Sequence, residues 1–135
     1  MQSIGKEVRK LTIKTIREYP IVIAVVNSDK IIITDGQSAL DFMMSVRYNT
    51  ESDCIALNKE AICEDFFKLS TGLAGEVLQK FVNYNLKFAI IGDFTGYTSQ
   101  PLKDFIYECN KGGHIFFLAN EDEAVKKFAG VMKNS

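Results

Sequence analysis

The loop from Gly92 to Ser99 holds the side chains best suited to chemistry in this chain. It joins a predicted strand to a predicted helix, and ligands of open α/β sheets gather at the carboxyl ends of strands. Asp93 is suited to act as a base or a cation ligand, and Tyr97 to stack or to hydrogen-bond. Ser99 can donate to an anion, and Lys103 can orient an anionic group. Ordinary turn chemistry explains the loop equally well, with Asp93 bonded to its own backbone and Ser99 capping the helix.

The tripeptide Ser70-Thr71-Gly72 stands immediately before the clearest amphipathic helix of the chain. A helix start presents unpaired N–H groups and a partial positive charge, which can hold an anion or stabilise an attached phosphate. Gly72 also lets a ligand or another backbone approach closely. The simpler interpretation, which we favour, is that Ser70 or Thr71 only caps the helix.

Lys80 and Tyr84 form a third candidate group. They are four residues apart on the same predicted helix and therefore lie on one side of it. That side could meet the Asp93 loop or a partner. A solvated surface explains the pair with fewer assumptions, because Lys80 lies outside the apolar stripe of the helix.

The common catalytic and metal-binding patterns are missing from the sequence. His114 is the only histidine, and no cysteine or carboxylate stands near it at ligand spacing, so we expect neither zinc nor another cofactor. There is no G-x-S-x-G elbow, no G-x-x-x-x-G-K-[ST] loop and no G-x-G-x-x-G fingerprint. The three cysteines form no C-x-x-C pair, which is typical of reduced thiols in a cytoplasmic protein.

The elements that must position these residues begin with strands. Leu11 and Ile13 alternate with polar neighbours, which predicts a strand with one solvated face. The apolar, β-branched run 21–26 predicts a strand buried on both faces. Residues 30–33 are predicted as a third strand, after a turn at 27–29.

Helices and strands alternate through the rest of the chain. The predicted strands lie at 54–57, 86–91 and 115–118. The first helix begins at a Thr34–Gln37 capping box, and a segment capped by Asn58 follows the strand at 54–57. The next helix, at 73–82, ends at a left-handed Asn85; the third is capped by Ser99 and stops at Gly112 or Gly113; the last is capped by Asn120 with Glu123. Repeated strand–helix–strand units favour parallel pairing with right-handed crossovers. We therefore expect a single α/β domain over residues 1–135, with a mixed sheet, an N-terminal hairpin and four or five helices.

Composition narrows the class of protein. The chain has 135 residues, 47% hydrophobic and 24% charged, which is typical of one globular domain. With 16 Lys+Arg against 17 Asp+Glu, it lacks the positive surplus of a general nucleic-acid binder. Its longest apolar run, 21–26, is too short to span a bilayer, and the first residues lack a signal-peptide core. A cytoplasmic location is expected.

Two long segments resemble a bacterial family known as domain of unknown function 4180. They are FFKLSTGLAGEVLQKFVNYN, from Phe66 to Asn85, and AIIGDFTGYTSQPLKDFIYECNKG, from Ala89 to Gly112. A weaker likeness covers SALDFMMSVRYN, at 38–49. The resemblance covers most of the chain after the first strands and implies no particular activity.

A looser resemblance joins this chain to the anti-sigma-factor antagonist (STAS) domains. Ser70-Thr71-Gly72-Leu73 is similar to their serine-serine-glycine-leucine segment at a helix start. The β-rich beginning and the later α/β alternation also suit a STAS-like sheet. The resemblance implies that Ser70, with Thr71 beside it, is the position phosphorylated by a partner kinase. Leu69 stands where those domains usually have an aspartate.

Two functions from different classes remain open. The first, which we favour, is a non-catalytic regulatory module that binds a protein partner or a small anionic ligand near Thr71 and Asp93. Homo-oligomerisation would fit the same role. The second is a small enzyme in which Asp93 is the general base and Tyr97, Ser99 or Lys103 orients an anionic substrate. That work requires Asp93 to lie in a closed pocket with a perturbed pKa.

Overall fold

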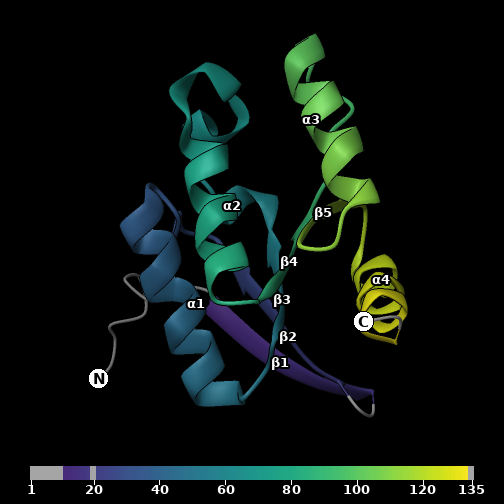
Figure 1. Cartoon of the computed structure of the whole chain (residues 1–135). Helices are drawn as coiled ribbons and strands as arrows, with labels where there is room; N and C mark the ends of the chain where they lie inside the picture. The colour runs from purple at the N-terminus through teal and green to yellow at the C-terminus, as the bar shows by residue number, and fades with distance from the viewer. Residues whose placement is uncertain (1–10, 19–20, 134–135) are drawn as a thin grey trace.

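One mixed sheet organises the chain in a computed structural model that describes residues 11–18 and 21–133 (Figure 1). The strands within these residues are β1 (Leu11–Glu18), β2 (Ile21–Ser28), β3 (Cys54–Asn58), β4 (Lys87–Ile91) and β5 (Ile115–Leu118). The α-helices are α1 (Gly36–Thr50), α2 (Leu73–Asn83), α3 (Gln100–Lys111) and α4 (Glu121–Lys133). Three short 3₁₀ helices, η2 (Lys59–Ala61), η3 (Glu64–Phe67) and η4 (Leu69–Thr71), lie between β3 and α2.

The strand order explains where the helices lie. The order is β1-β2-β3-β4-β5, with β1 antiparallel to β2 and the other neighbours parallel. Each crossover from β2 onward moves to the next strand in the same direction, so right-handed crossovers place α1, α2 and α3 on one face. Helix α4 follows the last strand and covers the other face (Figure 1). The predicted fold class, a single α/β domain with an N-terminal hairpin, is confirmed.

The two faces of the sheet have different cores. The α1–α3 face carries large side chains, and Phe81 of α2 stacks on Phe88 of β4 with ring centroids 4.2 Å apart. The α4 face is lined in its centre by small residues, Cys54, Ala56 and Ala89, all fully buried. Because these residues are small, a single helix can lie close enough to cover the middle of that face.

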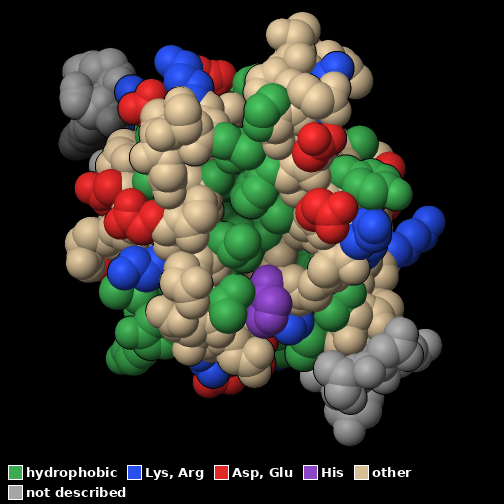
Figure 2. All heavy atoms as spheres, turned by 45° about the horizontal axis from the view of Figure 1, so that its top comes forward, with side chains coloured by type: hydrophobic (Ala, Val, Ile, Leu, Met, Phe, Trp, Pro, Cys, Tyr) green, Lys and Arg blue, Asp and Glu red, His purple; other side chains and the backbone are tan. Residues whose placement is uncertain are grey.

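Helices α2 and α3 lie on the same face of the sheet but do not pack tightly against each other. A groove of about 330 Å³ remains between them, lined by Leu78, Val82, Phe105 and Cys109 and reaching His114. Figure 2 shows a band of hydrophobic side chains along this face, with the histidine at one end of it. Burial raises the pKa of the Cys109 thiol to about 11, so this cysteine acts as an apolar lining group at neutral pH.

The predicted strand at 30–33 is wrong. Only an isolated bridge, between Ile33 and Ile62, forms there. Strand β2 already has β1 on one side and β3 on the other, so no edge is left beside it for the returning chain. The Ser28 hydroxyl donates to Lys30 O at 2.8 Å, and this bond turns the chain out of the sheet toward α1.

The predicted cap at Asn58 is also wrong. Its side-chain amide instead accepts from Ser28 N and donates to Ser28 O, both at 2.8 Å, and so ties β3 to the end of β2. The segment that follows forms η2, η3 and η4 rather than one helix. Its largest side chains, Phe66 and Phe67, are both buried, and tertiary packing has therefore overridden the local helical pattern.

Several helix ends were predicted correctly. Asn85 is left-handed with φ 56°, Gly112 ends α3, and Asn120 Oδ1 accepts from Glu123 N. Helix α1 differs, because its capping box is formed by Asp35 and Ser38 instead of Thr34 and Gln37. No α-helix within the described residues is long and apolar enough to cross a membrane.

Candidate functional site

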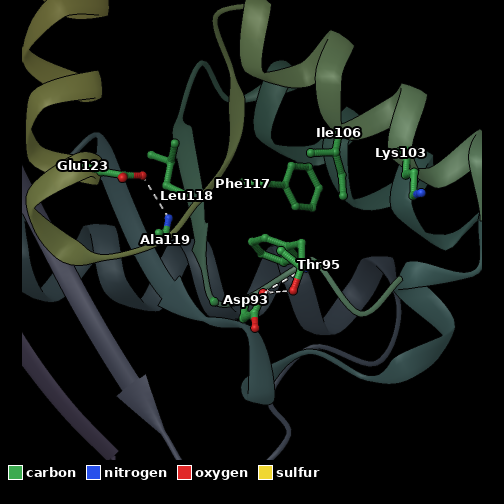
Figure 3. Close-up of a pocket in the computed structure, with 10 residues that line it drawn as sticks. Asp93, Thr95, Lys103, Ile106, Phe117, Leu118, Ala119 and Glu123 are labelled. Atoms are coloured by element: carbon green, nitrogen blue, oxygen red, sulfur yellow. Dashed lines mark hydrogen bonds between the residues drawn. The ribbon is translucent and has the colours of Figure 1, made fainter. Parts of the chain in front are cut away.

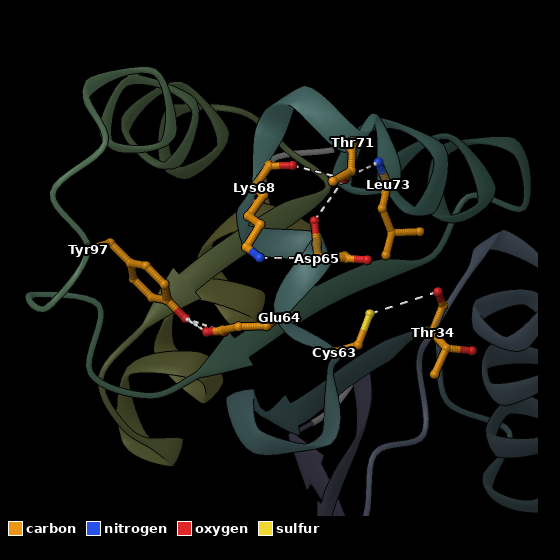
Figure 4. Close-up of polar contacts among 8 residues, drawn as sticks. All are labelled: Thr34, Cys63, Glu64, Asp65, Lys68, Thr71, Leu73 and Tyr97. Atoms are coloured by element: carbon orange, nitrogen blue, oxygen red, sulfur yellow. Dashed lines mark hydrogen bonds and ion pairs between the residues drawn. The ribbon is translucent and has the colours of Figure 1, made fainter.

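The β3–α2 segment and the β4–α3 loop lie side by side at the carboxyl edge of the parallel strands. Tyr97 joins them, because its ring stacks on Phe67 with centroids 5.1 Å apart. Its hydroxyl donates to the Glu64 carboxylate at 3.1 Å (Figure 4). Burial, together with the Glu64 charge, raises the pKa of Tyr97 to about 12, so the phenol stays protonated and holds the two segments together.

Lys59, from the segment that follows β3, holds the start of the β4–α3 loop. Its Nζ donates to Asp93 O at 3.0 Å and lies 4.9 Å from the Tyr97 ring centroid and 5.8 Å from that of Phe94. The stem of the lysine runs against Gly92, where an added Cβ would lie 2.8 Å from Lys59 Cβ. Only glycine therefore allows this close approach of strand β4 to the lysine.

Asp93 is exposed and turned toward its own loop. Its Oδ1 accepts from Thr95 N at 2.9 Å and from the Thr95 hydroxyl at 2.7 Å, which is the local bonding that turn chemistry predicts. These bonds hold the pKa of Asp93 below its usual value. The carboxylate is consequently a weak proton acceptor at neutral pH.

An open cleft of about 650 Å³ lies beside this loop, where β4 and β5 end. Its floor is apolar and is built from Phe94, Ile106, Phe117 and Leu118. Figure 3 shows Phe117 in the middle, with α3 on one side and the start of α4 on the other. The rings of Phe94 and Phe117 meet edge to face, with centroids 5.3 Å apart.

Three ionic side chains stand around the cleft, and they differ in what they already bind. Asp93 is engaged by Thr95, and Glu123 accepts from Ala119 N at 3.1 Å. Lys103 lines the cleft from α3, and its ammonium has no hydrogen-bond or ion-pair partner among the described residues. Of these three side chains, Lys103 is thus the one whose charged group is free to bind a ligand.

The other predicted residues of the loop face away from this cleft. Tyr97 and Ser99 line a separate hollow of about 280 Å³ with Glu64 and Lys68. Ser99 caps α3, accepting from Leu102 N at 3.3 Å. Ser99 therefore makes the helix-capping bond that ordinary turn chemistry predicted for it.

Ser70 and Thr71 are both exposed at the start of α2, but their hydroxyl groups differ. Thr71 Oγ1 lies 2.8 Å from both Asp65 O and Lys68 O and accepts from Leu73 N at 3.2 Å (Figure 4). Ser70 makes no side-chain hydrogen bond to a described residue. Gly72 is the N-cap, in a left-handed conformation with φ 80°, so Thr71 caps from one residue before it.

Lys80 and Tyr84 do not reach the Asp93 loop. Helix α2 runs antiparallel to the strands, so its last turn lies at the amino edge of the sheet, while Asp93 lies at the carboxyl edge. The prediction that this pair could meet the loop is wrong for this reason. Both residues remain available to a partner at the opposite end of the molecule.

Sequence reasoning missed most of the cleft. The sequence predicted only the elements that contain these residues: a helix for Ile106, a strand for Phe117 and Leu118, and a cap for Glu123. An apolar side chain beside a cavity has the same spacing as one in a core, so the pattern did not mark them as lining residues. The signal that could have found them is topological. The carboxyl ends of adjacent parallel strands meet, so the residues after β4 and β5 had to lie together.

No group of three or more His, Cys, Asp or Glu residues within the described part of the chain could hold a metal ion. The buried Nδ1 of His114 has no hydrogen-bond partner there, and it lies at the end of the α2–α3 groove rather than in the cleft.

Together these features define a small α/β domain with an open, apolar-floored cleft at the carboxyl edge of its parallel strands. The chain belongs to the family described as domain of unknown function DUF4180, whose model matches residues 19–128. The predicted membership is thereby confirmed. Neither the search of curated proteins nor the search of solved structures found a match, and the resemblance to STAS domains stays a prediction.

Proposed function

We propose that this protein is a non-catalytic binding module whose cleft between α3 and α4 takes a small ligand with an apolar body and one acidic group. The observation that carries the proposal is the pairing of an apolar floor with the unengaged ammonium of Lys103. A volume of about 650 Å³ is in the ordinary range for small-ligand sites.

The charges favour a single acidic group placed at α3. Asp93 and Glu123 would repel an anion, but each already accepts hydrogen bonds from its own loop. They stand away from Lys103, with Phe117 between Lys103 and Glu123 in Figure 3. A ligand that lies across Phe117 would bring its acidic end to Lys103 and leave its apolar body over the floor. A ligand with several negative charges would be disfavoured.

Catalysis with Asp93 as general base is the weaker alternative. A general base needs a pKa raised toward the working pH, whereas the bonds from Thr95 lower that of Asp93. The side chain is also exposed, so water solvates its charge instead of a closed site tuning it. Both features support binding over proton transfer.

The probe 8-anilinonaphthalene-1-sulfonate tests the proposal, because it combines an aromatic body with one sulfonate. Fluorescence titration of the folded protein should give saturable binding. Lys103→Gln should weaken this binding roughly two- to five-fold, the effect of one solvent-exposed ionic contact. Lys80→Gln is the matched control at the opposite end of the molecule. Equal affinities for the two variants, or no saturable binding to the wild type, would refute the proposal.

A regulatory role through phosphorylation has a separate supporting observation, the exposed and unbonded hydroxyl of Ser70. Phosphorylation at this position would place negative charge at the start of α2, where the helix dipole favours it. Intact-mass analysis of the protein from its own host, with peptide mapping, tests this role. A phosphate at Ser70 rather than Thr71 supports it, and unmodified protein under all growth conditions counts against it.

A further inference from the structure

The outer edge of β1 presents backbone groups that no described residue covers. Ser28 directs both its N–H and its C=O to Asn58 of β3. Backbone direction alternates along a strand, so Asn27, Val25, Ile23 and Ile21 bond to β1 instead. Their register partners in β1 are the even-numbered residues 12, 14, 16 and 18. The odd-numbered residues 11, 13, 15 and 17 therefore point their N–H and C=O groups away from the sheet.

At the opposite edge of the sheet, a side chain covers the outward backbone groups of β5. Asn110 of α3 donates to Phe117 O at 3.2 Å and accepts from Phe117 N at 2.7 Å, which blocks the outward backbone of β5. Exposed strand edges attract further strands, and covering their backbone groups is one of the ways in which proteins prevent this. The comparison indicates that the fold protects β5 from pairing, while β1 has no such side-chain cover among the described residues.

An apolar groove of about 340 Å³ runs beside β1 on the face covered by α1. Leu11 and Ile13 line it from the strand, and each is 44% exposed. Phe42 and Val46 line it from α1, and Asp41 stands at its polar rim. Among the described residues, an open strand edge and an exposed apolar groove thus lie next to each other at β1. The strand order places β1 at the opposite edge of the sheet from β5, whose end lines the ligand cleft.

We propose that a second copy of this chain pairs antiparallel with β1, joining the two sheets edge to edge around a two-fold axis. Such an axis stands perpendicular to the sheet and keeps both α1 helices on the same side. Each copy then brings the same odd-numbered residues to the junction, which is the self-complementarity that a symmetric dimer requires. The pairing satisfies both open edges together and narrows both grooves.

The charges of β1 favour the register centred on Thr15 over the one centred on Lys14. Placing Lys14 opposite its own copy would set like charges against each other across the strands. Placing Thr15 opposite its own copy avoids this and sets Arg17 opposite Ile13 of the second copy. Arg17 makes no ion pair with a described residue, and in this register it lies over the groove rimmed by Asp41 of the second copy. Lys14 remains paired with Glu121 of its own chain, at 2.9 Å.

Cysteine cross-linking of the full chain tests the register. Opposed residues that share both hydrogen bonds have Cα atoms about 5.5 Å apart, within disulfide range. Thr15→Cys should therefore form a covalent dimer on mild oxidation. Arg17→Cys should not, because its two copies would be about 14 Å apart along the strands. Equal cross-linking of the two variants would overturn the proposed register.

Sedimentation equilibrium tests the dimer itself. The wild type and Thr15→Val should be dimeric, whereas Thr15→Pro should be monomeric, because proline removes an outward N–H without breaking a bond to β2. Circular dichroism checks that each variant is folded. Arg17→Asp and Asp41→Arg should each raise the dissociation constant roughly two- to five-fold, and the double variant should restore it. A wild-type monomer at the highest soluble concentration, or a dimer that Thr15→Pro leaves intact, would overturn the proposal.

Discussion

Replacing Lys59 by methionine should loosen the loop that forms one wall of the ligand cleft. Methionine keeps most of the stem that packs against Gly92 but removes the ammonium, which donates to Asp93 O at 3.0 Å and faces the rings of Tyr97 and Phe94. A hydrogen bond from a charged donor contributes about 1.5 kcal/mol at the low end of its range, appropriate to an exposed acceptor. The cation–π contacts add about 0.5 kcal/mol.

The expected loss is therefore about 2 kcal/mol in the free energy of unfolding, or about 7 °C in Tm for a chain of this length. Urea unfolding followed by circular dichroism measures the first quantity. Hydrogen exchange should also show faster exchange of the Thr95 amide, because its partner Asp93 no longer has the hydrogen bond from Lys59. Lys80→Met is the matched control and should change neither quantity. A loss under about 0.5 kcal/mol, with unchanged Thr95 exchange, would refute the role assigned to Lys59.

Three further predictions concern the loop, the β5 edge and α2. Asn110→Ala should cost about 1–2 kcal/mol and promote self-association, because it exposes both backbone groups of Phe117; light scattering and urea unfolding measure the two effects. Asp93→Asn should lower the urea midpoint at pH 6, because the pKa of Asp93 is depressed in the folded state and its ionised form therefore stabilises the fold. The difference in midpoint from the wild type should fade as the pH falls below 3.8, where Asp93 becomes protonated. A difference that persists in acid would contradict this role of Asp93. Gly75→Ala should raise the free energy of unfolding by about 0.5–1 kcal/mol, because an added Cβ meets nothing within 4 Å in α2, and a loss of stability would show an unrecognised contact.

Hydrophobic patterning predicted most of the sheet and its helices. The alternation at Leu11 and Ile13 correctly indicated a strand, but both side chains are 44% exposed, so the predicted buried face is largely solvated. The buried run from Ile21 correctly indicated a central strand. Once the order of strands and helices was known, the handedness rule left little choice of topology. Helix ends were predictable where one side chain makes a local bond, as at Ser99 and Asn120.

Two of the failures come from long-range contacts that local patterns do not record. Asn58 was predicted to cap a helix, but it bonds to Ser28, thirty residues earlier in the chain. The segment around Phe66 and Phe67 carries a helical pattern but bends into short 3₁₀ turns to bury both rings. Tyr97 was predicted to stack or hydrogen-bond at the site, and in the structure it makes both kinds of contact within the protein, with Phe67 and Glu64. These partners come from the β3–α2 segment and could not be named in advance.

The candidate site was predictable in its location more than in its composition. The loop after β4 was identified because it follows the carboxyl end of a strand, and Asp93 and Lys103 do line the cleft there. Phe117 and Ile106 form its floor, but their apolar spacing is that of ordinary core residues. Whether an apolar side chain is covered depends on the neighbouring elements, and only the assembled fold places those.

The most direct measurement of the proposed function is amide chemical-shift mapping by NMR during titration with 8-anilinonaphthalene-1-sulfonate. The binding-module account predicts saturable shifts at Phe94, Lys103, Phe117 and Leu118, with α2 and β1 unchanged. It also predicts that Lys103→Gln weakens the titration while the same residues respond. Shifts centred on the α2–α3 groove, or no shifts at the cleft residues at saturation, would contradict the account.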